Sequence, residues 1–367
     1  MDLKQIPFLD LTVSDENEFD IHINSLKDIL QNGPLISGEP VRKFEQKISS
    51  YCNRKYAIAV NSGTSALILA MKSLGIGQGD EVIVPCLSWI ASANAIALTG
   101  AKPVFADIED DLNLSPASVR RLITNKVKAV LAVDFTGRPV QIDKIEEIAK
   151  EHEIPIIEDA AQAFGASLNS KKCGSFGHIS CFSLNPVKVF GALGEAGVIL
   201  TDDAQTAGYL DHLRNSGLKN RKELLEPSFN ARMDTIQASF LLNRMSEIEN
   251  KLRARRSNAR FYFHNLTNKV TKPNFPPCIE HSFYTFTIQT SKRDDLKSYL
   301  EENGVETQIQ HPILMCDQPA YSDSRKETSN ASKIVKRILS LPIHEKLDAE
   351  DLLYVTKTIN HFFGENS

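Results

Sequence analysis

The sequence predicts an α/β fold in which a large domain with a mostly parallel, doubly covered sheet precedes a small C-terminal α/β domain. A chain of 367 residues is too long for one small core. From Tyr56 onward, short apolar runs alternate with helix-length segments. Strands that alternate with helices form right-handed βαβ units, with helices on both faces of the sheet.

Four regions follow from this pattern. Residues 1–55 predict an N-terminal arm with helical periodicity at Glu16–Leu30 and Val41–Tyr51. Residues 56–234 form the large domain. A helix-rich stretch from Thr235 to about Thr267 predicts one long connecting helix within residues 235–270. Residues 271–367 form the small domain, whose size is usual for a domain.

The large domain alternates predicted strands with predicted helices. The run Val198–Thr201 follows Lys188 too closely for a helical crossover, so it is expected to be antiparallel to its neighbour. The other strands are expected at Ala57–Val60, Glu81–Pro85, Pro103–Ala106, Ala129–Val133, Pro155–Ile157 and Ile179–Leu184. Helices are expected at Thr64–Leu74, Ala91–Thr99, Pro116–Ile123, Ile142–His152 and Asp203–Leu213.

The small domain returns to mixed structure after a proline-rich segment. Strands are expected at Phe283–Thr290 and Val305–Gln310, and helices at Asp294–Asn303, Ala331–Leu339 and Ala349–Phe362.

Composition excludes several classes of protein. The net charge is −4 and no tract of lysine and arginine has the length that nucleic-acid binding requires. No run of eighteen apolar residues and no apolar leader is present, so neither membrane spanning nor secretion is expected. The six cysteines form no C-x-x-C pair and no zinc-type spacing. We therefore expect a cytoplasmic protein with reduced thiols and no metal.

Lys188 is the first candidate functional residue. It lies between the strand-like run Ile179–Leu184 and a glycine-rich turn, just after Pro186, which restricts the backbone around it. A lysine in such an ordered loop is suited to form an imine with a carbonyl compound. The alternative is an ordinary solvated loop lysine.

A second candidate is the segment Asn61–Ala66, which follows the first strand and opens the first helix. Helix N-termini bind anions, Gly63 permits close approach, and Thr64 adds a hydroxyl donor. The segment matches neither the P-loop nor the dinucleotide-binding fingerprint, so a single phosphate is the expected ligand. A simple helix cap is the alternative.

Further candidates follow other strands. Asp159 and Gln162 stand at the carboxyl end of a buried strand, where ligands bind in open α/β sheets, although Asp159 is equally suited to cap a helix. Trp89, the only tryptophan, is suited to stack on a planar ligand or to pack in a core or interface. Asn230 precedes the long connecting helix.

These groups together suit pyridoxal 5′-phosphate (PLP), which needs a lysine, a partner for its ring nitrogen, a stacking ring and one phosphate site. Their order and spacing resemble the DegT/StrS family of sugar aminotransferases, a branch of the fold-type-I, aspartate-aminotransferase-like PLP enzymes. The shared motifs are Asn-Ser-Gly-Thr-Ser-Ala-Leu from Asn61, Glu-Asp-Ala-Ala-Gln from Glu158 and Phe-Ser-x-x-Pro-x-Lys ending at Lys188. The similarity extends from about Gly33 to His344.

The resemblance implies roles for individual residues. Lys188 corresponds to the Schiff-base lysine and Asp159 to the partner of the pyridine nitrogen. Gln162 corresponds to the amide near the cofactor's phenolic oxygen, and Trp89 to the stacking ring.

The resemblance also implies a phosphate site and a dimer. Gly63, Thr64 and Ser183 correspond to the residues around the cofactor phosphate. Asn230 corresponds to an asparagine that reaches the same phosphate from the neighbouring subunit, so a homodimer with shared active sites is expected.

The activity that the resemblance implies is transfer of an amino group, with L-glutamate as donor, to a nucleotide-linked keto-hexose. A minority of the family dehydrates sugars and has a histidine in place of the lysine, and a non-catalytic PLP- or sugar-binding regulator is a further alternative. The family pattern changes at Asp134, Glu195, Ser216 and His311. These positions are expected to surround the substrate.

Overall fold

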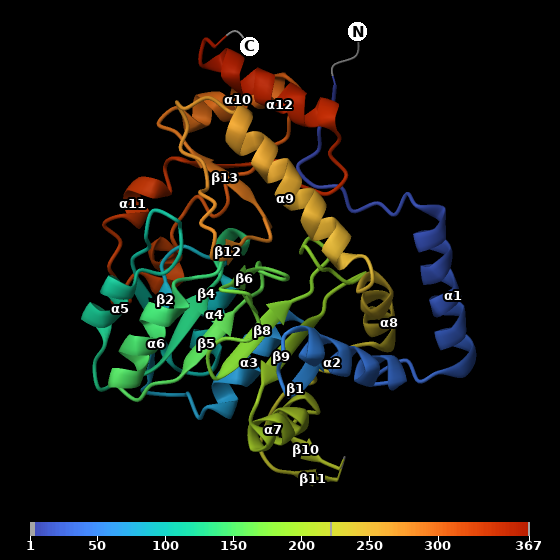
Figure 1. The fold of residues 1–367 in the computed structure, drawn as a ribbon. Helices are drawn as coiled ribbons and strands as arrows, with labels where there is room; N and C mark the ends of the chain where they lie inside the picture. Colours follow the sequence, from blue (N-terminus) through green and yellow to red (C-terminus); the bar gives the residue numbers. More distant parts are fainter. Residues whose placement is uncertain (1–3, 221, 366–367) are drawn as a thin grey trace.

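The computed structural model describes residues 4–220 and 222–365. At its centre is a seven-stranded sheet with the strand order β1-β9-β8-β5-β4-β2-β3 (Figure 1). Every neighbouring pair is parallel except the two pairs that include β9, which is antiparallel to β1 and to β8. The antiparallel placement expected for Val198–Thr201 is confirmed. The strands are β1 Tyr56–Val60, β2 Glu81–Pro85, β3 Lys102–Ala106, β4 Val127–Val133, β5 Ile156–Asp159, β8 Ile179–Ser183 and β9 Gly197–Thr201.

Helices cover both faces of this sheet because the strands are apolar on both sides. Ile83 of β2 packs with Phe44 and Ile145 on one face, whereas its neighbour Val84 packs with Leu69 on the other. The first face carries α2 Glu39–Tyr51, α5 Pro116–Leu122, α6 Ile142–Glu151 and α8 Thr235–Arg244. The second carries α3 Gly63–Ser73, α4 Ala91–Leu98 and α7 Ala204–Arg214.

The N-terminal arm contains α1, Glu16–Asn32, and α2. In Figure 1, α1 stands at the edge of the molecule beside α8. Short hairpins complete the large domain. They are formed by β6 Ser167–Leu168, β7 Lys171–Lys172, β10 Leu218–Lys219 and β11 Glu223–Leu224, and β12 Ile279–Glu280 adds to β6.

The connection between the domains differs from the single long helix that the sequence predicts. It is divided into α8 and α9, Ile248–Asn265. At the break, the hydroxyl of Ser246 donates to the carbonyl of Asn243 at 3.0 Å. Serine side chains that bond to the backbone in this way offer it an alternative to helical pairing.

The small domain forms around α9, which rises into it in Figure 1. Tyr262 of α9 is fully buried there, together with Phe286 and Leu300. The remaining elements are β13 Phe286–Gln289, α10 Arg293–Glu302, η2 Met315–Asp317, η3 Pro319–Tyr321, α11 Ala331–Ile334, β14 Ile338–Leu341 and α12 Ala349–Phe362, of which η2 and η3 are short 3₁₀ helices.

Two expectations for residues 271–367 were wrong in detail. The predicted helix Ala331–Leu339 ends after one turn, because the apolar run Ile338–Leu341 pairs with β13 as strand β14. The range 305–310 forms no strand and makes isolated bridges through Val305 and Gln308. Residues 314–335 moreover pack against the core of the large domain. None of the helices in the described part of the chain is long and apolar enough to cross a membrane.

Candidate active site

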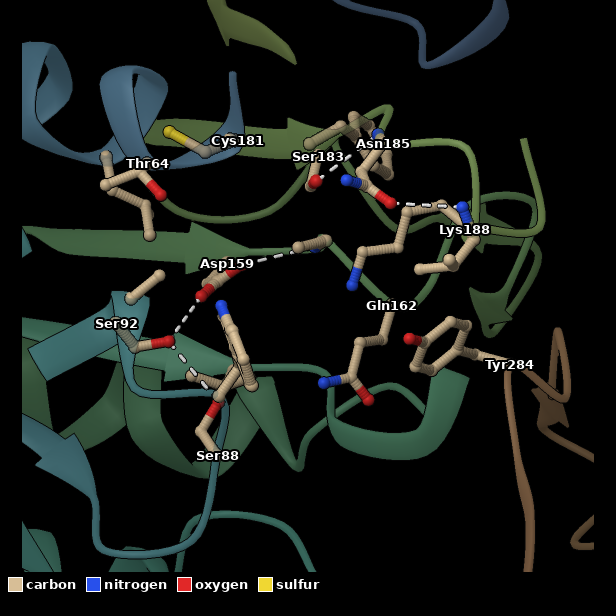
Figure 2. A pocket seen from close by; sticks show the side chains of 18 of the residues that line it. Thr64, Ser88, Ser92, Asp159, Gln162, Cys181, Ser183, Asn185, Lys188 and Tyr284 are labelled. Atoms are coloured by element: carbon tan, nitrogen blue, oxygen red, sulfur yellow. Dashed lines mark hydrogen bonds between the residues drawn. The ribbon is translucent and has the colours of Figure 1, made fainter. Parts of the chain in front are cut away.

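A cavity of about 370 Å³ lies where the carboxyl ends of β1, β2, β5 and β8 meet (Figure 2). Parallel strands end on the same edge of a sheet, so side chains far apart in the sequence converge there. The structure brings seven of the eight candidate residues to this cavity. They are Gly63, Thr64, Trp89, Asp159, Gln162, Ser183 and Lys188.

Lys188 reaches the cavity from the loop after β8. Its backbone N–H donates to the carbonyl of Asn185 at 2.9 Å. Its Nζ lies 4.5 Å from the centre of the Tyr284 ring. Within the described residues this nitrogen has no hydrogen bond and no ion pair, so the half-buried amine of Lys188 is available to a ligand.

Asp159 is the last residue of β5 and is only 4% exposed. One carboxylate oxygen accepts from the hydroxyl of Ser92 at 2.8 Å and the other from the backbone N–H of Ala161 at 3.2 Å. Burial raises the pKa of Asp159, while these two hydrogen bonds and the charge of Lys188 oppose the rise. A buried carboxylate of this kind gains from a protonated ring nitrogen beside it.

The N-terminus of α3 and the end of β8 form an anion site. Ser62 caps α3 by accepting from the N–H of Ser65 at 3.0 Å. The next residue, Gly63, packs so closely on β8 that a Cβ there would lie 2.6 Å from Cβ of Ser183. The hydroxyls of Thr64 and Ser183 therefore line the cavity beside a helix N-terminus, which favours a phosphate.

Gln162 and Trp89 line other walls of the cavity. The side-chain oxygen of Gln162 accepts from the N–H of Thr136 at 2.8 Å, which fixes the amide. Trp89 is 57% exposed, and its ring centre lies 5.6 Å from that of His311. Trp89 is therefore at the open side of the cavity.

Asn230 is not brought to the cavity of its own chain. It is exposed, and its side-chain oxygen accepts from Nε of Arg232 at 2.9 Å. Its assignment to a partner's cavity stays a prediction.

Several cavity residues were not foreseen. Ser88 and Ser92 lie on either side of Trp89 at helical spacing, and this spacing was the sequence feature that could have identified them. Tyr284, from the segment before β13, has no sequence feature that would have identified it as a cavity residue. His311 was noted only as a departure from the family pattern. Burial and the charge of Lys188 lower the pKa of His311 to about 4, so its imidazole is neutral at physiological pH.

Asp134 does not surround a substrate, contrary to expectation. Its carboxyl group is buried on the other side of the sheet, close to the side chains of Glu158 and Cys173. Residue 134 follows Val133, whose side chain lines the cavity, and successive side chains of a strand point to opposite faces. Burial, then the charge of Glu158, raises the pKa of Asp134.

A fit to PLP can be judged from this donor set. The cavity holds a free lysine amine, a buried carboxylate and a helix N-terminus with two hydroxyls, each on a different wall. PLP offers an aldehyde, a basic ring nitrogen and a phosphate to these three groups. The residues fit the cofactor.

Comparisons with known proteins agree with this geometry. Residues 17–360 match the model of the DegT/DnrJ/EryC1/StrS aminotransferase family. The chain is 36% identical to a dTDP-3-amino-3,6-dideoxy-alpha-D-galactopyranose transaminase of Aneurinibacillus thermoaerophilus, over 97% of this chain and 99% of that protein. It is 33% identical to a protein of Geobacillus stearothermophilus named pleiotropic regulatory protein, over 98% of each chain. The solved structure of NtdA from Bacillus subtilis, with bound cofactor PMP, is 28% identical with a TM-score of 0.92, covering 100% of this chain and 86% of that one.

Proposed function

The chain belongs to the DegT/DnrJ/EryC1/StrS aminotransferase family and uses PLP, and from this premise we propose that it transfers an amino group from L-glutamate to a nucleotide-linked keto-hexose. The observation that carries the proposal is the convergence of Lys188, Asp159 and the N-terminus of α3 on one cavity. The free thiols support a cytoplasmic setting.

The cavity residues have distinct parts in holding the cofactor. Gly63, Thr64 and Ser183 would hold the phosphate, and Asp159 would pair with the ring nitrogen. The amine of Lys188 would hold the aldehyde carbon. When bound, PLP supplies a carbonyl that accepts an amino group and a ring that takes up the electrons left when a carbon loses its proton.

Lys188 also moves the proton. Its Nζ has no hydrogen bond or ion pair within the described residues, and Lys188 lines the cavity beside Tyr284. An amine in this position would be suited to take the proton from the α-carbon of the substrate and to deliver it to the cofactor carbon that carried the aldehyde. Asp159 would hold its charge toward the ring nitrogen of the bound cofactor.

A homodimer with shared sites forms part of the proposal. Val187 and Leu193, on either side of Lys188, expose 39% and 55% of their surface, and Phe229, next to Asn230, exposes 37%. Val187 lines the cavity, and exposed apolar side chains of this kind suit contact with a second copy of the chain. Asn230 would then reach the cofactor phosphate of the partner.

The assay for the main proposal uses a panel of 3-keto and 4-keto hexoses linked to TDP, UDP or GDP, with glutamate as donor. Mass spectrometry should detect an amino sugar from at least one member, and none with Lys188→Ala. If the PLP-loaded protein aminates no member although glutamate converts its cofactor, the substrate class is wrong.

The shared site can be tested by complementation. In a dimer of Lys188→Ala with Asn230→Asp, one cavity carries both changes and the other carries neither. The new carboxylate repels the phosphate, so each variant alone should be weak or inactive. The mixed dimer should recover about half of the wild-type activity. An inactive mixed dimer, folded and with excess PLP, would contradict the shared site.

A non-catalytic regulator is the second candidate, because one relative is named a pleiotropic regulatory protein. The presence of both Lys188 and Asp159 in the cavity favours the enzyme. The same substrate panel distinguishes the two, since a regulator would bind a ligand without producing an amino sugar.

A further inference from the structure

Two serines from the loop after β2 and the start of α4 form a short chain of hydroxyls that ends on Asp159 (Figure 2). Oγ of Ser92 donates to Oδ2 of Asp159 at 2.8 Å. Oγ of Ser88 lies 3.3 Å from Oγ of Ser92. Ser88 is 3% and Ser92 2% exposed, so solvent does not replace these contacts readily.

The charge of Asp159 sets the direction of the hydrogen bonds between the two serines and the carboxylate. Ser92 donates to Asp159, as it must whenever the carboxylate is ionised and has no proton to donate. The oxygen of Ser92 is then free to accept from Ser88, and both hydroxyl dipoles point toward the carboxylate. Hydrogen bonds linked in this way strengthen one another.

Each oxygen of the carboxylate is thus held by a different element. Oδ2 is bound by Ser92 of α4 and Oδ1 by the backbone N–H of Ala161, which follows β5. The backbone of Ser92 is itself fixed, because its N–H donates to the carbonyl of Trp89 at 3.1 Å. The plane of the carboxylate is therefore set before a ligand arrives.

We propose that Ser92, supported by Ser88, is a positioning residue that holds the Asp159 carboxylate toward the ring nitrogen of the cofactor. This inference rests on the proposed function, because it assigns Asp159 to that nitrogen. A hydrogen bond to an ionised group is among the stronger polar contacts in a protein. Its loss leaves a buried carboxylate that binds a proton more tightly.

Loss of the Ser92 hydroxyl should raise the pKa of Asp159. Burial already raises the pKa of Asp159, and the hydrogen bond from Ser92 is the first of the contacts that lower it. Without the hydroxyl, Asp159 would hold a proton more tightly and would support the positive charge of a bound ring nitrogen less well. Proton removal from the substrate should then slow.

The test loads the enzyme with PLP labelled with ¹⁵N at the ring and records its NMR signal without substrate. In Ser92→Ala the signal should move toward that of an unprotonated ring nitrogen. In a separate assay kcat should fall by about tenfold, the equivalent of one pKa unit. Ser88→Ala should shift both measurements less, in the same direction. Ser92→Thr keeps the hydroxyl and should restore both.

Ser118→Ala is the matched control. Ser118 is fully buried and its hydroxyl also donates to a carboxylate, that of Glu327 at 2.7 Å, but it does not line the cavity. Its loss should leave the nitrogen signal in place. A wild-type signal in Ser92→Ala, or a Thr variant as impaired as the Ala variant, would overturn the proposal. The signal requires bound PLP only, so it still decides the matter if no keto-hexose is aminated.

Discussion

The contact between α3 and β8 can be tested by replacing Gly63 with alanine. The added Cβ would lie 2.6 Å from Cβ and 2.9 Å from Cα of Ser183. Because a backbone atom is involved, the helix or the strand must move. Overpacking of this kind costs about 1–3 kcal/mol. The same movement separates Thr64 from Ser183, so we expect the dissociation constant for PLP to rise about tenfold, equivalent to about 1.4 kcal/mol.

Two measurements separate stability from binding. Thermal unfolding of the cofactor-free protein reports the packing cost, and a fluorescence titration with PLP reports the affinity. Gly208→Ala in α7 is the matched control, since a Cβ there meets no atom within 4 Å. It should stabilise the helix by about 0.5–1 kcal/mol and leave PLP binding unchanged. A Gly63→Ala protein that binds PLP as tightly as wild type would refute the reasoning.

Four further predictions concern single side chains. Lys188→Ala or Lys188→Arg should abolish turnover, and circular dichroism should show that the fold is intact. Turnover within about tenfold of wild type would contradict the role assigned to Lys188. Asp159→Ala should slow removal of the α-proton of glutamate by at least about a hundredfold, a larger effect than its loss of PLP affinity. Single-turnover absorbance measures this rate, and an unchanged rate would leave Asp159 only a structural role. The pKa of Asp134 is higher in the folded protein than its ordinary value of 3.8 in the unfolded chain. The contribution of this group to the free energy of unfolding is therefore fully present below pH 3.8 and is lost as the pH rises through the raised pKa. Asp134→Asn should therefore raise the unfolding midpoint at neutral pH and flatten its pH dependence. Glu158→Gln should lower the midpoint, because Glu158 accepts the N–H groups of Gly174 and Phe176. The opposite order of midpoints would show that Glu158 carries the proton.

The sequence alone determined most of the central sheet and much of the site. Apolar runs of strand length, separated by helical periodicity, predicted a parallel sheet, and the short gap after Lys188 predicted the antiparallel strand β9. Candidate site residues at or after the ends of three strands, Gly63, Asp159 and Lys188, were therefore expected on one edge. They line one cavity because parallel strands all end there.

Other elements depended on pairing that local sequence does not encode. The run Ile338–Leu341 suits a helix or a strand equally, and only the open edge of β13 made it β14. Non-local partners decide such ambiguous segments.

Within the site, only the tertiary structure decided what neighbouring residues do. Glu158 and Asp159 are adjacent carboxylates in the sequence, yet the alternation of strand side chains sends Asp159 to the cavity and Glu158 to Asp134 on the other face. The hydrogen bond between Ser92 and Asp159 joins residues 67 positions apart. Sequence shows which side chains carry the chemistry, but the fold determines which hydroxyl meets which carboxylate by placing the start of α4 beside the end of β5. Hydrogen bonds depend on distances of a few ångströms that only the folded chain sets.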